Sequence, residues 1–217
     1  MDRIEYISTH LGAESDVLKE LYRQTHLKVA NPHMISGHEQ GRLLSMFSRM
    51  IRPEKILEIG TFTGYSAICL AEGLAPGGKL YTIEQNDELV EMAASFFEKA
   101  GMADRIIQLT GDALEIIPEL NMVFDMAFID AAKRRYADYY RKAFNTVREG
   151  GYILIDNILW HDKVVDKNFH DPTTLLLREF NDLISNDLLV DKAIIQNRDG
   201  MFILHKRNKI DNSPFHT

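Results

Sequence analysis

Residues 55–74 read KILEIGTFTGYSAICLAEGL, and this stretch decides the fold class. Its first residues, Lys55–Ile59, form a short apolar run that is typical of a buried strand. Two glycines, Gly60 and Gly64, then allow a tight turn. The apolar residues of Tyr65–Leu74 favour a helix. The stretch therefore predicts a strand, a glycine turn and a helix, which is the repeating unit of parallel sheets.

The same alternation continues along the chain. Further strands are predicted at Lys79–Ile83, Arg105–Leu109, Met126–Ile129 and Tyr152–Ile155, and helices at Asp87–Ala100, Ala113–Leu120 and Arg134–Val147. Glycines stand where these helices should stop, at Gly77-Gly78, Gly101 and Gly150-Gly151. This order favours an α/β fold whose doubly wound, mostly parallel sheet is covered on both faces.

The two ends of the chain depart from this pattern. Residues 1–51 have apolar positions at helical spacing, and Ser36 with Glu39 has the spacing of a capping box. Near the other end, a helix at Thr173–Asn186 is followed by strand-like runs at Leu188–Ile195 and Met201–His205. Asp199-Gly200 between these runs indicates a hairpin. We expect one domain, residues 1–206, with N-terminal helices at 1–51, an α/β core at 52–206 and a flexible tail at 207–217.

Composition excludes several classes of protein. The 217 residues carry 25 Lys and Arg against 32 Asp and Glu, a net charge of −7, so nucleic acid is not an expected partner. The single cysteine, Cys69, cannot form an internal disulfide. The N-terminus lacks the pattern of a signal peptide, and no apolar run reaches the length of a membrane span. We expect a cytoplasmic protein without membrane contact.

Open α/β sheets bind ligands beyond the carboxyl ends of their strands, so the residues there are the first candidates. Glu58 stands just before the glycine turn, whose G-x-x-x-G spacing differs from that of a pyrophosphate-binding turn. A carboxylate there would repel a pyrophosphate and suit a ligand with positive charge. The alternative is a turn that only connects strand and helix.

The next two strand ends also carry acids. Glu84 is placed to accept hydrogen bonds from two ribose hydroxyls, or it is a solvated loop acid. Asp112 either caps the following helix or lies beside a nucleoside base that packs on Ala113.

The fourth and fifth predicted strands end in Asp130 and in Asp156-Asn157. If these strands are neighbours, the three side chains converge and offer oxygen ligands to a hard cation such as Mg²⁺. Lys133 would then lie near the metal, which would lower the lysine pKa and make it a general base. The alternatives are two unrelated strand-end acids and a solvated lysine.

These segments resemble those of a known family. Residues 58–66, EIGTFTGYS, look like the first motif of S-adenosylmethionine-dependent methyltransferases. Residues 129–133, IDAAK, with Tyr136 and Tyr139-Tyr140 downstream, look like the metal and lysine segment of the caffeoyl-CoA and catechol O-methyltransferases. Residues 156–160, DNILW, are very similar to the D-N-x-L-W segment of the caffeoyl-CoA type. The resemblance extends over roughly residues 4–206.

The resemblance implies a role for each candidate. It implies a class I, Rossmann-like fold whose seven-stranded sheet ends in an antiparallel strand, and a homodimer. Lys133 would be the catalytic base, with Asp130 beside it, and Trp160 would be a wall of the substrate pocket. The metal, Mg²⁺ or else Mn²⁺ or Ca²⁺, would be held by Asp130, Asp156 and Asn157. S-adenosylmethionine would be bound by Met34, Ser36, Glu58, Gly60, Tyr65, Ser66, Glu84, Asp112, Ala113 and Asp130.

The implied function is metal-dependent methyl transfer to an aromatic vicinal diol, of the catechol or caffeoyl type. His161 stands where plant members usually carry Asn, so the acceptor stays open. Two alternatives remain: an NAD-dependent Rossmann oxidoreductase, and a catalytically inactive cofactor-binding subunit.

Overall fold

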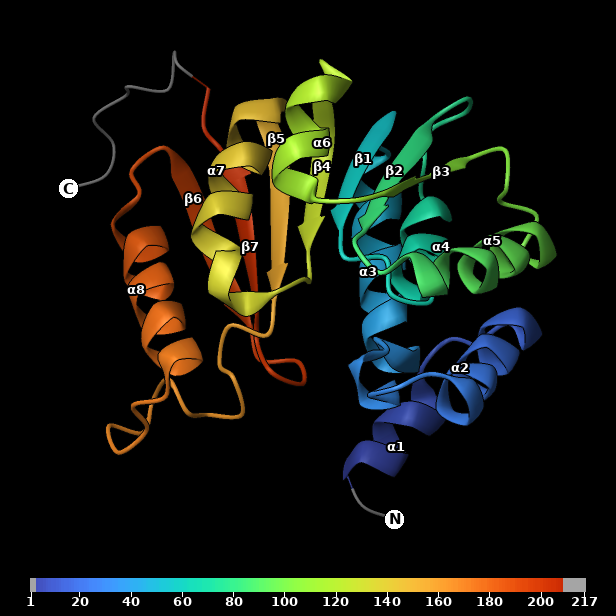
Figure 1. Cartoon of the computed structure of the whole chain (residues 1–217), viewed down its shortest axis with the longest axis horizontal. Coiled ribbons are helices and arrows are strands. Elements are labelled where there is room, and N and C mark those ends of the chain that lie inside the picture. The colour runs from blue at the N-terminus through green and yellow to red at the C-terminus, as the bar shows by residue number, and fades with distance from the viewer. Residues whose placement is uncertain (1–2, 209–217) are drawn as a thin grey trace. The chain divides into compact units, whose positions relative to one another are not determined.

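The computed structural model describes residues 3–208 (Figure 1). The predicted flexible tail therefore lies almost entirely outside the described residues. The strands are β1 (Lys55–Ile59), β2 (Lys79–Glu84), β3 (Ile106–Thr110), β4 (Phe124–Ile129), β5 (Val147–Asp156), β6 (Val190–Ile195) and β7 (Met201–Lys206). The α-helices are α1 (Arg3–His10), α2 (Asp16–Lys28), α3 (Gly37–Ile51), α4 (Tyr65–Ala71), α5 (Val90–Lys99), α6 (Ala113–Leu120), α7 (Tyr136–Thr146) and α8 (Pro172–Asn186). Three 3-10 turns are η1 (Pro32–Met34), η2 (Asp87–Leu89) and η3 (Lys133–Arg135).

The strands form one sheet in the order β3-β2-β1-β4-β5-β7-β6. The pairs β2–β3, β1–β4 and β4–β5 are parallel, whereas β7 runs antiparallel to both β5 and β6. The predicted hairpin is present, because Ile195 pairs with Met201 across the turn that contains Asp199-Gly200. The expected seven-stranded sheet with an antiparallel last strand is confirmed.

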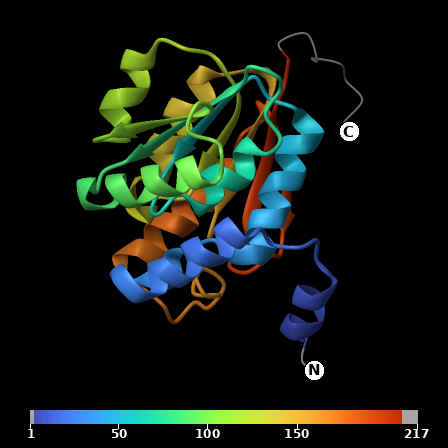
Figure 2. The ribbon, with the colours of Figure 1, turned by 90° about the vertical axis from the view of Figure 1, so that its right-hand side faces the viewer.

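The chain divides into two compact units. The first comprises residues 3–55 and 60–112 of the described chain. In it α4 packs against α3 and against β2 and β3, while α2 contacts α4 and α5 (Figure 2). Apolar residues from each of these elements are buried, among them Leu18, Leu44, Leu70, Leu80 and Phe97.

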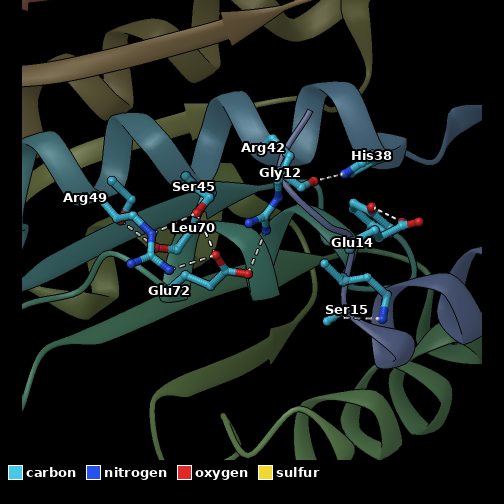
Figure 3. A network of polar contacts seen from close by, with 12 residues as sticks. Gly12, Glu14, Ser15, His38, Arg42, Ser45, Arg49, Leu70 and Glu72 are labelled. Carbon is cyan, nitrogen blue, oxygen red and sulfur yellow. Dashed lines mark hydrogen bonds and ion pairs between the residues drawn. The ribbon is translucent and has the colours of Figure 1, made fainter. Parts of the chain in front are cut away.

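A polar cluster joins α3 to the end of α4 (Figure 3). The Glu72 carboxylate accepts hydrogen bonds from Arg42 Nη2 at 2.7 Å, Ser45 Oγ at 2.6 Å and Arg49 Nη2 at 3.2 Å. Burial alone would raise the pKa of Glu72. The hydrogen bonds from Arg42, Ser45 and Arg49, together with the charge of Arg42, outweigh burial and lower the pKa. The cluster therefore fixes α3 against α4 through a charged carboxylate.

The second unit comprises residues 56–59 and 113–208 of the described chain. In it α7 packs against β4 and β5, and α8 packs against α7 and η3 (Figure 1). Its core contains Phe124, Phe128, Leu154, Leu177 and Phe180. No helix of residues 3–208 is both long and apolar enough to cross a membrane.

Two local predictions were wrong. Ser36 does stand at the start of α3, but its backbone is helical and its side chain does not cap the helix, so the capping box is not formed. Gly150-Gly151 lies inside β5 instead of ending a helix. Gly150 has φ +69°, and a Cβ on Gly151 would come within 2.6 Å of Val147 Cγ1. The glycines therefore serve an irregularity at which β5 shifts its register on β4.

Candidate active site

The turn between β1 and α4 has three residues in left-handed backbone conformations. They are Gly60 at φ +103°, Phe62 at +49° and Gly64 at +93°. A Cβ on Gly64 would come within 2.5 Å of the Phe97 ring, so both conformation and space require glycine there. A left-handed Phe62 is strained, and such strain persists where the surroundings hold the backbone in place.

Side-chain hydrogen bonds hold this turn at several points. Thr61 Oγ1 lies 2.5 Å from Thr82 Oγ1 on β2, and Thr63 Oγ1 lies 3.0 Å from Thr25 Oγ1 on α2. Between them, the Phe62 backbone N–H donates to Glu84 Oε2 at 2.7 Å. Contacts within the protein thus fix the turn, which suits a site that places backbone groups against a ligand.

Glu84 is fixed in turn. Besides the bond from Phe62, its Oε1 accepts the Asn86 N–H at 2.9 Å. A carboxylate has about four acceptor sites, so two backbone bonds leave capacity for two ribose hydroxyls. Glu84 is only partly exposed and is bonded on both oxygens, which does not fit a freely solvated loop acid.

The other predicted cofactor residues of the first unit lie on or beside its helices. Met34 ends η1 and is exposed, Ser36 is buried, and Ser66 is buried in the first turn of α4. The Tyr65 hydroxyl donates to Glu14, and burial with this bond raises the pKa of Tyr65 above its usual range. Tyr65 thereby ties the segment before α2 to α4. Asp112 is the last residue of the unit.

In the second unit, the predicted metal residues lie at neighbouring strand ends. Ile129 of β4 pairs with Ile155 of β5, so Asp130 and Asp156 each follow a member of one pair. The backbone N–H of Asp130 donates to Ile59 O at the end of β1. The premise that the fourth and fifth strands are neighbours is confirmed.

Two further residues flank these strand ends. Asn157 follows Asp156 with φ +56°, and Glu58 lies within β1, where its side chain is fully buried. Ala113, buried, is the first residue of α6.

A hydrogen-bonded group, which we call the lysine cluster, links Asp130, Lys133, Tyr136 and Asp156. Lys133 Nζ donates to Asp130 Oδ1 and to Tyr136 Oη, both at 2.7 Å. Tyr136 Oη donates to the Asp156 backbone oxygen at 2.9 Å. Burial, followed by the charges of Asp130 and Asp156, raises the pKa of Tyr136 well above its usual range, so its hydroxyl stays protonated.

The donor set of the predicted metal site suits a hard cation, because two carboxylates and an amide oxygen are ligands that Mg²⁺ prefers. Asp130 Oδ1 is paired with Lys133, but a carboxylate has a second oxygen to offer. Within residues 3–208, no group of three or more His, Cys, Asp or Glu side chains is arranged to hold a metal. A site at Asp130, Asp156 and Asn157 would hold only two such side chains.

The segment after β5 carries Trp160. Residues 160–162 are all left-handed, with φ of +52°, +55° and +60°. The His161 N–H donates to Asp199 Oδ1 at 2.5 Å, and the Leu159 N–H donates to Asp199 O at 2.9 Å. The Trp160 indole Nε1 is buried and has no hydrogen-bond partner among the described residues.

Sequence reasoning missed three residues here. Tyr136 appeared only as part of a motif, although its spacing of three from Lys133 on a helix start was a usable signal. Arg178 and Asp199 bond to backbone groups of the segment after β5, and such contacts leave no spacing signature in the sequence.

Comparison with known proteins identifies the class. A model of the O-methyltransferase family matches residues 6–207, so the chain belongs to this family. This assignment confirms the resemblance and makes the chain an O-methyltransferase, so the dehydrogenase alternative falls away.

Individual relatives extend the likeness over most of the chain. A catechol O-methyltransferase of Niastella koreensis is 35% identical over 196 residues, 88% of each chain. A caffeoyl-CoA O-methyltransferase of Populus kitakamiensis is 32% identical over 213 residues, 93% of this chain and 91% of the relative. The crystal structure of the O-methyltransferase TomG from Streptomyces achromogenes, in complex with SAM (S-adenosylmethionine), is similar with a TM-score of 0.87 and 33% identity, covering 94% of this chain and 95% of that one.

Proposed function

We propose that this enzyme transfers the methyl group of S-adenosylmethionine to a phenolic oxygen of an aromatic vicinal diol, with a divalent cation, preferably Mg²⁺, in its site. The lysine cluster is the observation that carries this proposal. In it, the amine of Lys133 contacts the carboxylate of Asp130 at the end of β4, and β4 is the neighbour of β5, which ends in Asp156. The relatives named catechol O-methyltransferase and caffeoyl-CoA O-methyltransferase support the acceptor class.

On this proposal Asp130, Asp156 and Asn157 hold the cation, and both diol oxygens bind beside it. When bound, the cation supplies Lewis acidity that favours the phenolate form of the acceptor. Lys133 takes the phenolic proton. In its ammonium form, Lys133 has three N–H groups, and two of them donate to Asp130 and Tyr136. The third position on the nitrogen remains for exchange of the proton with the acceptor.

Glu84 and the glycine turn bind the cofactor on this proposal. Glu84 accepts the ribose hydroxyls, while Gly60 and Ser66 hold the methionine end. The carboxylates of Glu58 and Glu84 also favour a cationic cofactor over an anionic one. Holding the sulfonium methyl in contact with the phenolic oxygen supplies much of the acceleration.

Asp156→Ala tests the metal assignment. We expect catechol methylation, measured with radiolabelled S-adenosylmethionine and Mg²⁺, to fall at least about 100-fold, roughly 2.7 kcal/mol, because a cation ligand is lost. EDTA should abolish the wild-type activity, and excess Mg²⁺ should restore it.

The matched control is Asp138→Ala, which removes an exposed carboxylate of the same unit that pairs with Arg141. Its activity should stay within twofold of wild type. Activity that survives both EDTA and Asp156→Ala would refute metal dependence, and a wild type inactive on every diol tested would refute the acceptor class.

A further inference from the structure

One arginine holds most of the segment that follows Trp160. Arg178 lies on α8, and its guanidinium donates to four backbone oxygens between residues 163 and 169. The distances are 2.9 Å from Nε to Val164 O, 2.8 Å from Nη1 to Phe169 O, and 2.8 Å and 2.6 Å from Nη2 to Lys163 O and Asp166 O. A planar guanidinium with fixed donors can hold several carbonyls in one geometry, which a lysine cannot.

The start of the same segment is held from two sides. Asn181, one turn further along α8, donates from Nδ2 to Ile158 O at 2.9 Å. From the β6–β7 hairpin, Asp199 accepts the His161 N–H. Gly200 permits this approach, because a Cβ there would lie 2.6 Å from Leu159 Cγ.

The backbone so held is strained. Three consecutive residues without glycine, Trp160 to Asp162, are left-handed, a conformation that costs free energy at each position. Such strain persists only where other contacts determine the conformation. Asp199 accepts the His161 N–H within this run, and Arg178 holds the backbone directly after it, at Lys163 and Val164. Functional sites are where strain of this kind is usually found.

The segment is also connected to the lysine cluster. The helix α8, which carries Arg178, packs against η3, which carries Lys133. Arg134 Nε donates to Thr173 Oγ1 in the first turn of α8 at 3.2 Å. The indole Nε1 of Trp160 is buried, and no residue of the described part of the chain accepts a hydrogen bond from it.

We propose that Arg178 is a specificity-determining positioning residue. By holding the backbone at residues 163–169, it stabilises the segment that begins with Trp160 as a pre-formed acceptor wall. A flat aromatic ring of the acceptor packs against the indole of this wall. The wall is ordered without the acceptor. The inference rests on the proposed function for the identity of the acceptor. The fixing of the segment itself does not depend on that function.

The chain offers a direct probe, because Trp160 is its single tryptophan. We compare Arg178→Met, which keeps an unbranched stem, and Arg178→Lys, which keeps the charge. Arg141→Met is the control, since Arg141 is an exposed arginine of the same unit. In the absence of substrate, we expect the acrylamide quenching constant of Trp160 to rise at least twofold in Arg178→Met, less in Arg178→Lys, and not in the control.

Kinetics and binding then test the specificity role. In Arg178→Met we expect the KM for catechol to rise at least tenfold while kcat changes less than threefold, because the wall positions the acceptor without touching the reacting atoms. The dissociation constant of S-adenosylhomocysteine, by calorimetry, should stay within twofold. Asp199→Ala removes the side-chain acceptor of the His161 N–H and should also raise the catechol KM. This variant serves as the test if Arg178→Met does not fold.

Each outcome bears on one claim. Unchanged quenching of Trp160 in a folded Arg178→Met would overturn the fixing of the segment, whatever the substrate. Raised quenching with an unchanged catechol KM would overturn the specificity role. If the wild type does not methylate catechol and catechol does not quench the fluorescence of Trp160, the proposed acceptor class is refuted. The acrylamide comparison still tests whether Arg178 fixes the segment.

Discussion

Glu84 is expected to act twice in cofactor binding, once on the ligand and once on the turn that receives it. Its carboxylate holds the Phe62 N–H as well as facing a proposed ribose. A hydrogen bond to a charged group contributes about 1.5–3 kcal/mol. Glu84→Ala should therefore weaken S-adenosylhomocysteine binding about 10- to 100-fold, measured by calorimetry, and Glu84→Gln should weaken it less. Glu88→Ala, an exposed neighbour, should bind normally, and a normal Glu84→Ala would refute the ribose role.

At this scale the sequence predicts strand-end residues better than those that support them. Asp130 and Asp156 could be foreseen because a strand end is a position that hydrophobic pattern locates. Tyr136 and Arg178 could not be assigned a role in the same way. Their partners are a backbone oxygen of a distant strand and four carbonyls of an irregular segment, which exist only after folding.

The contact between α3 and α4 should depend on pH through Glu72. Its folded-state pKa is lowered, so its stabilisation is fully present above the unfolded pKa and is lost as pH falls through the folded pKa. At pH 7, Glu72→Gln should lower the free energy of unfolding by about 1.5–3 kcal/mol, since charged hydrogen bonds from Arg42 and Arg49 are lost. Urea unfolding at a series of pH values should show this difference shrinking below about pH 4.5.

Glu98→Gln, at an exposed position of α5 in the same unit, is the control and should show little change at any pH. A Glu72→Gln effect that stays constant between pH 7 and pH 3 would mean that the charge on Glu72 does not hold the two helices together.

Element boundaries show where the sequence signal ends. The strands β1 and β2 begin where predicted, because apolar runs mark them. The helix α4 ends at Ala71 and not at Leu74, since Glu72 turns to its arginine partners and Gly73 packs against α3, where a Cβ would lie 2.2 Å from the Arg49 backbone nitrogen. Such an ending depends on the neighbouring helix, which local periodicity does not describe.

For the whole molecule, net charge and composition argued against a nucleic-acid-binding or membrane-spanning protein. The order of strands and helices predicted the fold. The antiparallel hairpin was predicted from two strand-like runs with Asp199-Gly200 between them, a dipeptide that favours a tight hairpin turn. What the chain-wide pattern could not predict was the division into two compact units, because contacts between distant segments determine it. At this scale, the binding of the cofactor product S-adenosylhomocysteine to the intact chain tests the proposed function.

A ligand that binds only the folded protein raises its stability by mass action. At 100 times its dissociation constant, S-adenosylhomocysteine should add about 2.7 kcal/mol. For a chain of this size that corresponds to a rise in melting temperature of about 5–11 °C, measured by differential scanning fluorimetry. NAD at the same concentration should cause no shift, because Glu58 and the G-x-x-x-G turn disfavour a pyrophosphate. A shift with NAD, or none with S-adenosylhomocysteine, would contradict the cofactor assignment independently of metal and acceptor.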